Sequence, residues 1–180
     1  MTETQAKEIL YSMTETESLR KHAHTVAVVM EALAEKFGES KEDFKVTGLL
    51  HDADYEKYPD EHPNIIVNKL TAMGEEKIAH AIAGHYTIWN IPRESLLDKC
   101  IVAADELTGF IVAASLVRPL GLEGMTAKSV MKKFKTKTFA AKVDRGEVIK
   151  GAELIGMELR DLVTFIIAVL EKNKEALGLT

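Results

Sequence analysis

The sequence predicts an all-α fold, and three observations lead to this prediction. Apolar residues recur at intervals of three and four along most of the chain, as they do in amphipathic helices. The chain contains no alternating runs of Val, Ile and Thr bounded by hairpin turn pairs such as Asn-Gly. Its 180 residues are 46% hydrophobic, which suffices for a full core without metal or disulfides. We therefore expect a single helical domain over residues 1–180.

The first predicted helix carries the clearest signals. The segment Thr14-Glu-Thr-Glu17 matches a capping box, in which side chains three residues apart satisfy backbone N–H groups at a helix start. Gly38 is suited to end the helix, because glycine readily adopts the left-handed backbone of a helix C-terminus. The apolar positions between these limits share one helix face: Leu19, Ala23, Val26, Met30, Leu33 and Phe37.

Further helices are predicted in order along the chain. Ser40 can cap a helix that runs to His51, and His62-Pro63 places Pro at the first helical position with His62 as the cap. Gly74 then separates two short helices. The later predicted helices span about Glu94 to Val117 after Pro92, a basic stretch from Thr126 to Lys135, Gly146 to Gly156, and Glu158 to Leu177.

Composition limits the classes of function. The N-terminus lacks the layout of a signal peptide and no apolar stretch could cross a bilayer, so we expect a cytoplasmic protein without membrane contact. Cys100 lies in an apolar run and is expected to be buried.

The net charge is −5, yet the segment 118–150 holds nine Lys and Arg against three acids. That segment can hold anionic substrate groups or form a solvated helix face, but duplex nucleic acid is not an expected partner.

The adjacent pair His51-Asp52 is the strongest chemical signal. Imidazole and carboxylate together suit a divalent transition metal. Neighbouring residues diverge by about 100° on a helix, so both can bind one ion only at a helix end. Asp54 could replace Asp52 or could hydrogen-bond a ligand histidine.

Two histidines compete on the first predicted helix. His24 shares a face with Arg20, Ala27 and Glu31, away from the apolar stripe, as a ligand with a nearby acid would. His22 lies closer to the stripe, where a hydrogen-bonded core or rim histidine is the ordinary interpretation. We therefore prefer His24 as the ligand.

Other polar residues along the chain could join the same site. Asp105 follows apolar residues 101–104, and a bare carboxylate there would be costly to bury without a cation, although Glu106 could be the inward group instead. His62 is a ligand or an exposed loop residue. His80 and His85 lie about 140° apart on a helix, so His80 is expected outside any centre that uses His85.

The order His24, His51-Asp52, His62, His85, Asp105 resembles the HD-domain superfamily of metal-dependent phosphohydrolases, over about Leu19 to Leu116. The residues that flank these histidines also resemble the family. The matching segments are Leu-Arg-Lys-His-Ala-His-Thr-Val-Ala, Gly-Leu-Leu-His-Asp, Glu-His-Pro and Ala-Ile-Ala-Gly-His. The stretches Ala-Asp-Glu-Leu-Thr-Gly-Phe and Ser-Val-Met-Lys-Lys-Phe-Lys resemble an uncharacterised bacterial branch of HD hydrolases. The resemblance implies a metal-binding core over about residues 16–117 and a helical extension over about 118–180.

The resemblance also implies one or two divalent ions of Fe, Mn, Co, Ni or Zn. One ion would take His24, His51, Asp52 and Asp105, and a second would take Asp52, His62 and His85. His51 and Asp52 would be catalytic in phosphoester hydrolysis, on a nucleotide or another small phosphorylated metabolite. The alternatives are an HD-type di-iron oxygenase and a non-catalytic module that binds a regulatory nucleotide or metal.

Phosphate contacts are the least specific part of the prediction. HD hydrolases of cyclic di-GMP and of diadenosine tetraphosphate place a Lys three positions after the doublet Asp, where this chain has Tyr55. A phosphate clamp would therefore come from elsewhere, and the candidates are Arg20, Lys57, Arg93, Lys132, Lys133 and Arg145.

Overall fold

The computed structural model describes residues 1–179, and these residues form helices and turns without a strand. The all-α prediction is therefore confirmed. Contacts between residues group the chain into two compact units, Met1–Ile101 and Val102–Thr180, so the division falls inside helix α6 (Leu96–Leu116). The expected boundary between the metal-binding core and the helical extension was near residue 117. The division inside α6 differs from it, and the single-domain organisation stays a prediction.

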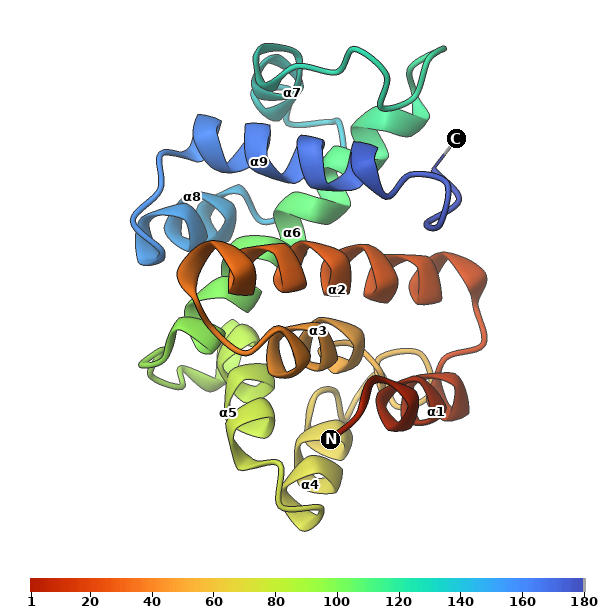
Figure 1. The fold of residues 1–180 in the computed structure, drawn as a ribbon, viewed down its shortest axis with the longest axis vertical. Coiled ribbons are helices and arrows are strands. Elements are labelled where there is room, and N and C mark those ends of the chain that lie inside the picture. The colour runs from red at the N-terminus through yellow and green to blue at the C-terminus, as the bar shows by residue number, and fades with distance from the viewer. Residues whose placement is uncertain (180) are drawn as a thin grey trace. The chain divides into compact units, whose positions relative to one another are not determined.

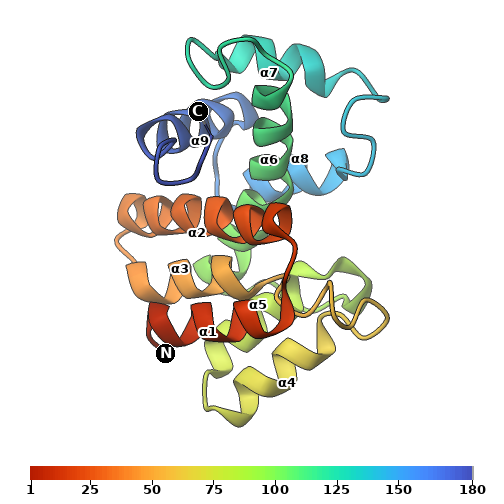
Figure 2. The same cartoon turned by 90° about the vertical axis from the view of Figure 1, so that its right-hand side faces the viewer.

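The first unit contains five helices before α6. α2 and α3 lie side by side in both views, α1 packs on α3, and α4 pairs with α5 (Figures 1 and 2). Their bounds are α1 Glu3–Met13, α2 Glu17–Phe37, α3 Lys41–Leu50, α4 Asn64–Ala72 and α5 Glu76–His85, followed by the short 3-10 helix η1 Thr87–Trp89.

The helix-end predictions in this unit are met in part. Gly38 ends α2 with φ 72°, and the Ser40 side chain caps α3 by accepting from the N–H of Asp43, both as expected. The capping box at Thr14 is wrong, because α2 begins after Thr16 and the buried Thr14 hydroxyl donates to the Ala53 carbonyl at 2.9 Å. His62 is not the cap of α4 either, since the position before its first residue is Pro63.

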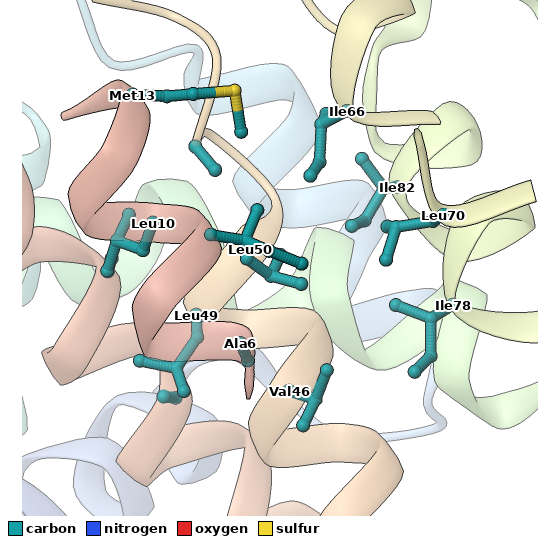
Figure 3. Close-up of a cluster of buried hydrophobic side chains, with 14 of the residues drawn as sticks. Ala6, Leu10, Met13, Val46, Leu49, Leu50, Ile66, Leu70, Ile78 and Ile82 are labelled. Atoms are coloured by element: carbon teal, nitrogen blue, oxygen red, sulfur yellow. The ribbon is translucent and has the colours of Figure 1, made fainter. Parts of the chain in front are cut away.

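The core of the first unit is a cluster of buried hydrophobic side chains mainly from the helices α1 to α5. Figure 3 shows the labelled side chains of this cluster pointing toward one another from α1, α3, α4 and α5. Removal of this apolar surface from water is the main stabilising contribution to the packing of these helices. The labelled members are Ala6, Leu10, Met13, Val46, Leu49, Leu50, Ile66, Leu70, Ile78 and Ile82.

Gly48 sets the distance between α2 and α3. A Cβ atom at this position would lie 2.6 Å from the Cα of Ala27, closer than any side chain allows. Only glycine therefore permits the two backbones to approach this closely. His51 follows Gly48 by three residues on α3, so the same contact brings the end of α3 against α2.

The second unit contains the remainder of α6 together with α7 (Ala127–Phe134), α8 (Arg145–Leu154) and α9 (Leu159–Lys172). α7 and α8 both pack on α9. At Gly151 a Cβ atom would lie 2.7 Å from the Cα of Ala103, so α8 approaches the backbone of α6 closely. α7 lies within the predicted basic stretch from Thr126 to Lys135, with Thr126 as its cap. α9 ends at Lys172, five residues before the predicted Leu177.

Two expectations drawn from composition concern the burial of Cys100 and the lengths of the apolar helices. The Cys100 side chain is fully buried, and burial raises the pKa of its thiol to about 12. The expectation of a buried cysteine is thereby confirmed. Among the described residues, every helix falls short of the length and apolar character required to cross a membrane.

Candidate metal centre

The candidate site forms where α3 ends. α3 stops at Leu50, and His51 is its C-terminal cap, with its backbone N–H bonded to the Thr47 carbonyl. The backbone at His51 is still helical, with φ −54° and ψ −37°, and Asp52 follows in the turn. The two side chains nevertheless meet, with Nε2 of His51 3.5 Å from Oδ2 of Asp52. His51 is fully buried, whereas the Asp52 side chain keeps 29% of its surface exposed.

Asp52 divides its two carboxylate oxygens between two pairs of histidines. Its Oδ2 lies 3.5 Å from Nε2 of His51 and 3.8 Å from Nε2 of His22. Its Oδ1 lies 3.4 Å from Nε2 of His62 and 3.5 Å from Nε2 of His85. In each of these two groups the possible ligand atoms lie within 4.8 Å of one another. The geometry therefore fits two cation positions that share Asp52.

Hydrogen bonds to Nδ1 fix the tautomer of the His51 and His85 rings. Nδ1 of His51 lies 2.8 Å from the Gly48 carbonyl, and Nδ1 of His85 faces the Ile82 carbonyl. A carbonyl oxygen only accepts, so both Nδ1 atoms must carry the proton. In the neutral imidazole, Nε2 then presents a lone pair toward Asp52, which is the form that binds a metal.

Asp54 holds the third histidine in the same way. Its Oδ1 accepts from Nδ1 of His62 at 2.7 Å, and its Oδ2 accepts from the backbone N–H of Ile66 at 2.9 Å. Asp54 is fully buried, so both oxygens are committed to these bonds. Of the two roles considered from the sequence, the hydrogen-bonding partner of a histidine is the one observed.

The electrostatics of the site favour an ionised Asp52. Burial raises the pKa of this carboxyl, but the charge and hydrogen bond of His51, with the hydrogen bond of His85, outweigh burial and hold the pKa well below its usual range. An anionic oxygen therefore faces each histidine pair. A bound divalent cation would take the place of the protonated imidazole in neutralising this carboxylate.

The structure reverses the preference between the two histidines of α2. Nε2 of His22 lies 3.2 Å from Nε2 of His51, inside the candidate site. Nε2 of His24 instead lies 2.8 Å from the hydroxyl of Tyr11 on α1. Burial, and then the charge of Lys7, lowers the pKa of His24. His22, and not the expected His24, therefore lies among the residues that could hold a metal ion, and the ligand role of either histidine stays a prediction.

The difference between the expected and the observed position has a clear physical origin. A ligand was expected to project from a polar face of the helix, away from the apolar stripe. The site instead lies where α2 packs on α3, so its histidine must lie beside the buried stripe, as His22 does. A search for polar residues at the edge of the packing face, not opposite it, would have found His22.

Comparison with known proteins agrees with this arrangement. A family model described as the HD domain matches residues 19–109, about half of the chain. The chain belongs to the HD domain family. Comparison with curated proteins and with solved structures gave no significant match. The name of the family corresponds to the His51-Asp52 pair at the centre of the cluster.

Asp105 was a predicted ligand of the HD site, and His80 was expected to lie outside it. Asp105 lies in the second unit, about one helical turn beyond Ile101 on α6, and its ligand role stays a prediction. His80 pairs with the buried Asp98, with Nδ1 and Oδ1 3.1 Å apart, and neither ligand group contains it. The expectation that His80 lies outside the HD site is met.

The phosphate-contact candidates of the first unit are engaged in local structure. Nε of Arg20 donates to the Thr14 carbonyl at 2.7 Å, and its guanidinium stacks over Tyr11. The ammonium of Lys57 donates to the Ser12 carbonyl at 3.3 Å. Nε of Arg93 donates to the Gly84 carbonyl at 3.0 Å, immediately before His85. Arg93 therefore supports the end of the helix that carries an HD-site histidine.

The candidates of the second unit have different environments. Arg145 donates to several carbonyls of the loop between α7 and α8, including Val143 at 2.9 Å, and stacks on Phe110 and Phe134. This pattern identifies a structural anchor. Nζ of Lys133 lies 4.6 Å from the centre of the Phe139 ring. Lys132 is exposed and has no such contact among the described residues.

Proposed function

We propose that this protein is a metal-dependent phosphohydrolase that acts on a nucleotide or another small phosphorylated metabolite. One observation carries the proposal. Asp52 presents one oxygen to His22 and His51 and the other oxygen to His62 and His85, and all four imidazoles turn Nε2 toward it. A bridging carboxylate between two ligand pairs is typical of two-metal phosphoester hydrolysis.

The proposed ligand sets follow from this geometry. His22, His51 and Asp52, with Asp105 as a proposed fourth ligand, would hold one ion. Asp52, His62 and His85 would hold a second. Mixed imidazole and carboxylate ligands suit Fe, Mn, Co, Ni or Zn better than Mg or Ca. When bound, such ions lower the pKa of a coordinated water and polarise a phosphoryl oxygen.

The residues of this chain supply positioning. The Gly48 and Ile82 carbonyls and the Asp54 carboxylate fix the orientation of His51, His85 and His62 through their Nδ1 atoms. His51 is fully buried, and His62 is enclosed edge-on by Tyr55 and Tyr86, with ring centres 5.5 Å away in each case.

The test combines metal content with turnover. Purified wild-type protein, reconstituted with Mn, Fe, Co, Ni or Zn, should retain one to two equivalents of ion and release phosphate from p-nitrophenyl phosphate or a nucleoside monophosphate. His51→Ala and Asp52→Ala should lose both properties while remaining folded by circular dichroism. Asp60→Ala is the matched control, because this exposed acid lies in the same turn region and should leave both properties unchanged.

Each other outcome has a definite meaning. Metal near zero in the wild type after reconstitution would overturn the proposal. Oxygen uptake with reduced iron and no ester hydrolysis would favour an HD-type oxygenase, and bound metal with neither activity would favour a non-catalytic binding module.

A further inference from the structure

A basic hollow lies within the second unit, and the proposed function makes no use of it. Its volume is about 770 Å³, and residues of α7 and of the first turn of α9 line it. Four of the seven lining residues are cationic and none is acidic. The cations are Lys128, Lys132, Lys135 and Arg160.

Helical spacing explains why these cations meet. Lys128, Lys132 and Lys135 stand at i, i+4 and i+7, so they lie on one face of α7. Ala127 and Val130 on the other side of the helix are buried. The burial of this apolar side turns the three ammonium groups outward together.

The four positive charges lack compensation within the described part of the chain. None of them forms an ion pair with a carboxylate there, whereas Lys7 and Lys45 of the first unit are both paired with acids. Like charges held close together repel, and a bound anion relieves this repulsion. The cluster therefore favours a ligand with more than one negative charge.

A second hollow adjoins the basic one. It has a volume of about 460 Å³ and shares Thr126, Lys128 and Arg160 with its neighbour. Thr164 and the apolar residues Met125, Ala127 and Ile167 complete its lining. Cavities of about 300 to 1,000 Å³ suit small-molecule ligands. The two adjoining hollows, called the groove below, thus offer a charged end and an end lined in part by apolar side chains.

We propose that this groove binds a small soluble ligand with two or more phosphate groups and an apolar or aromatic body, such as a nucleoside di- or triphosphate. The phosphates would lie against the four cations, and the body would lie over Met125 and Ile167. None of the residues that line the groove belongs to the histidine cluster, so the groove would serve as a binding site for a second ligand.

Calorimetric titration of the full chain tests the proposal. In EDTA, which removes metal from the histidine cluster, ATP should bind with one equivalent per chain, and inorganic triphosphate should bind more weakly because it lacks the body. The triple variant Lys128→Gln, Lys132→Gln, Lys135→Gln should raise the Kd by about tenfold or more, because charge-assisted hydrogen bonds to phosphate are lost. Arg160→Gln alone should also raise it.

A matched triple variant controls for overall charge. Lys137, Lys142 and Lys150 are exposed and lie outside both hollows, so their replacement by Gln removes three charges and should leave the Kd unchanged. His51→Ala should also bind ATP normally. The proposal is overturned if ATP does not bind, if both triple variants weaken binding equally, or if binding depends on His51. Binding only to vesicles that contain polyphosphoinositides, without binding of ATP or triphosphate, would also overturn it, because the ligand would then be a lipid.

Discussion

Asp54 and His62 form a buried carboxylate–imidazole pair, with Oδ1 of Asp54 2.7 Å from Nδ1 of His62. The second oxygen of Asp54 accepts the backbone N–H of Ile66 at the start of α4. One side chain therefore sets both the direction of the His62 ring and the position of the helix that follows. Because the proton is held on Nδ1, the Nε2 lone pair stays directed toward Asp52.

Replacing Asp54 should weaken metal binding without removing a ligand. Asp54→Ala leaves the Nδ1–H of His62 unpaired and frees the ring to rotate. Loss of such an outer partner commonly reduces metal affinity by about 10- to 100-fold. Metal titration of the reconstituted protein measures the change, with Asp60→Ala as the exposed control. Unchanged affinity in a folded Asp54→Ala variant would contradict the positioning role of Asp54.

His22 and His24 allow a direct comparison within one helix. His22→Ala should weaken binding of the ion shared with His51, because it removes a proposed ligand. The loss of metal affinity should exceed the roughly 10- to 100-fold loss that follows removal of an outer partner. His24→Ala should bind metal like the wild type, since its Nε2 contacts Tyr11 and not the cluster. Metal content of the two purified variants gives the answer. A larger loss in His24→Ala would restore the ligand set expected from the sequence.

The pH dependence of stability should include a contribution from Glu3. Hydrogen bonds from Lys7 and then Lys45 lower the pKa of Glu3 below its usual 4.5, with ion-pair distances of 2.7 and 3.0 Å. A group whose pKa is lower in the folded state stabilises the protein above its unfolded pKa, and this contribution is lost as pH falls through the folded pKa. Denaturant unfolding from pH 6 to pH 3 should therefore show a smaller loss in Glu3→Gln than in the wild type. Glu8→Gln, at an exposed position of the same helix, should behave like the wild type.

The sequence predicts what depends on local pattern. The apolar stripe from Leu19 to Phe37, the left-handed Gly38 and the Ser40 cap are all determined within a few residues, and each is present as expected. The pattern of α1 is also local, with a Thr2–Gln5 capping box and an apolar face, but this short helix was not predicted.

The differences from expectation concern residues whose environment depends on a distant partner. Thr14 was expected to cap a helix, but its hydroxyl donates to Ala53, 39 residues away. His22 was set aside because its neighbours on α2 are apolar, yet those neighbours are what bring it against His51. Local pattern identifies both histidines as candidates, and only the packing of α2 on α3 distinguishes between them.

That packing depends on Gly48, and its replacement gives the most demanding prediction. In a free helix Gly→Ala is favourable by about 1 kcal/mol. At Gly48 the new Cβ would lie 2.6 Å from the Cα and 2.8 Å from the backbone N of Ala27, and backbone atoms cannot move aside as a flexible side chain can. Overpacking of this kind costs about 1 to 3 kcal/mol, so the free energy of unfolding should fall despite the better helix propensity.

Gly84 on α5 provides the matched comparison for Gly48. Its nearest neighbour to an added Cβ is the Cγ of Arg93 at 3.8 Å, an ordinary contact, so Gly84→Ala should leave the stability unchanged or raise it by up to about 1 kcal/mol. Because Gly48→Ala pushes α3 away from α2, it should also separate His51 from His22 and weaken metal binding. Chemical denaturation with and without metal measures both effects. If Gly48→Ala is as stable as Gly84→Ala and binds metal normally, the close approach of α2 and α3 does not position the site.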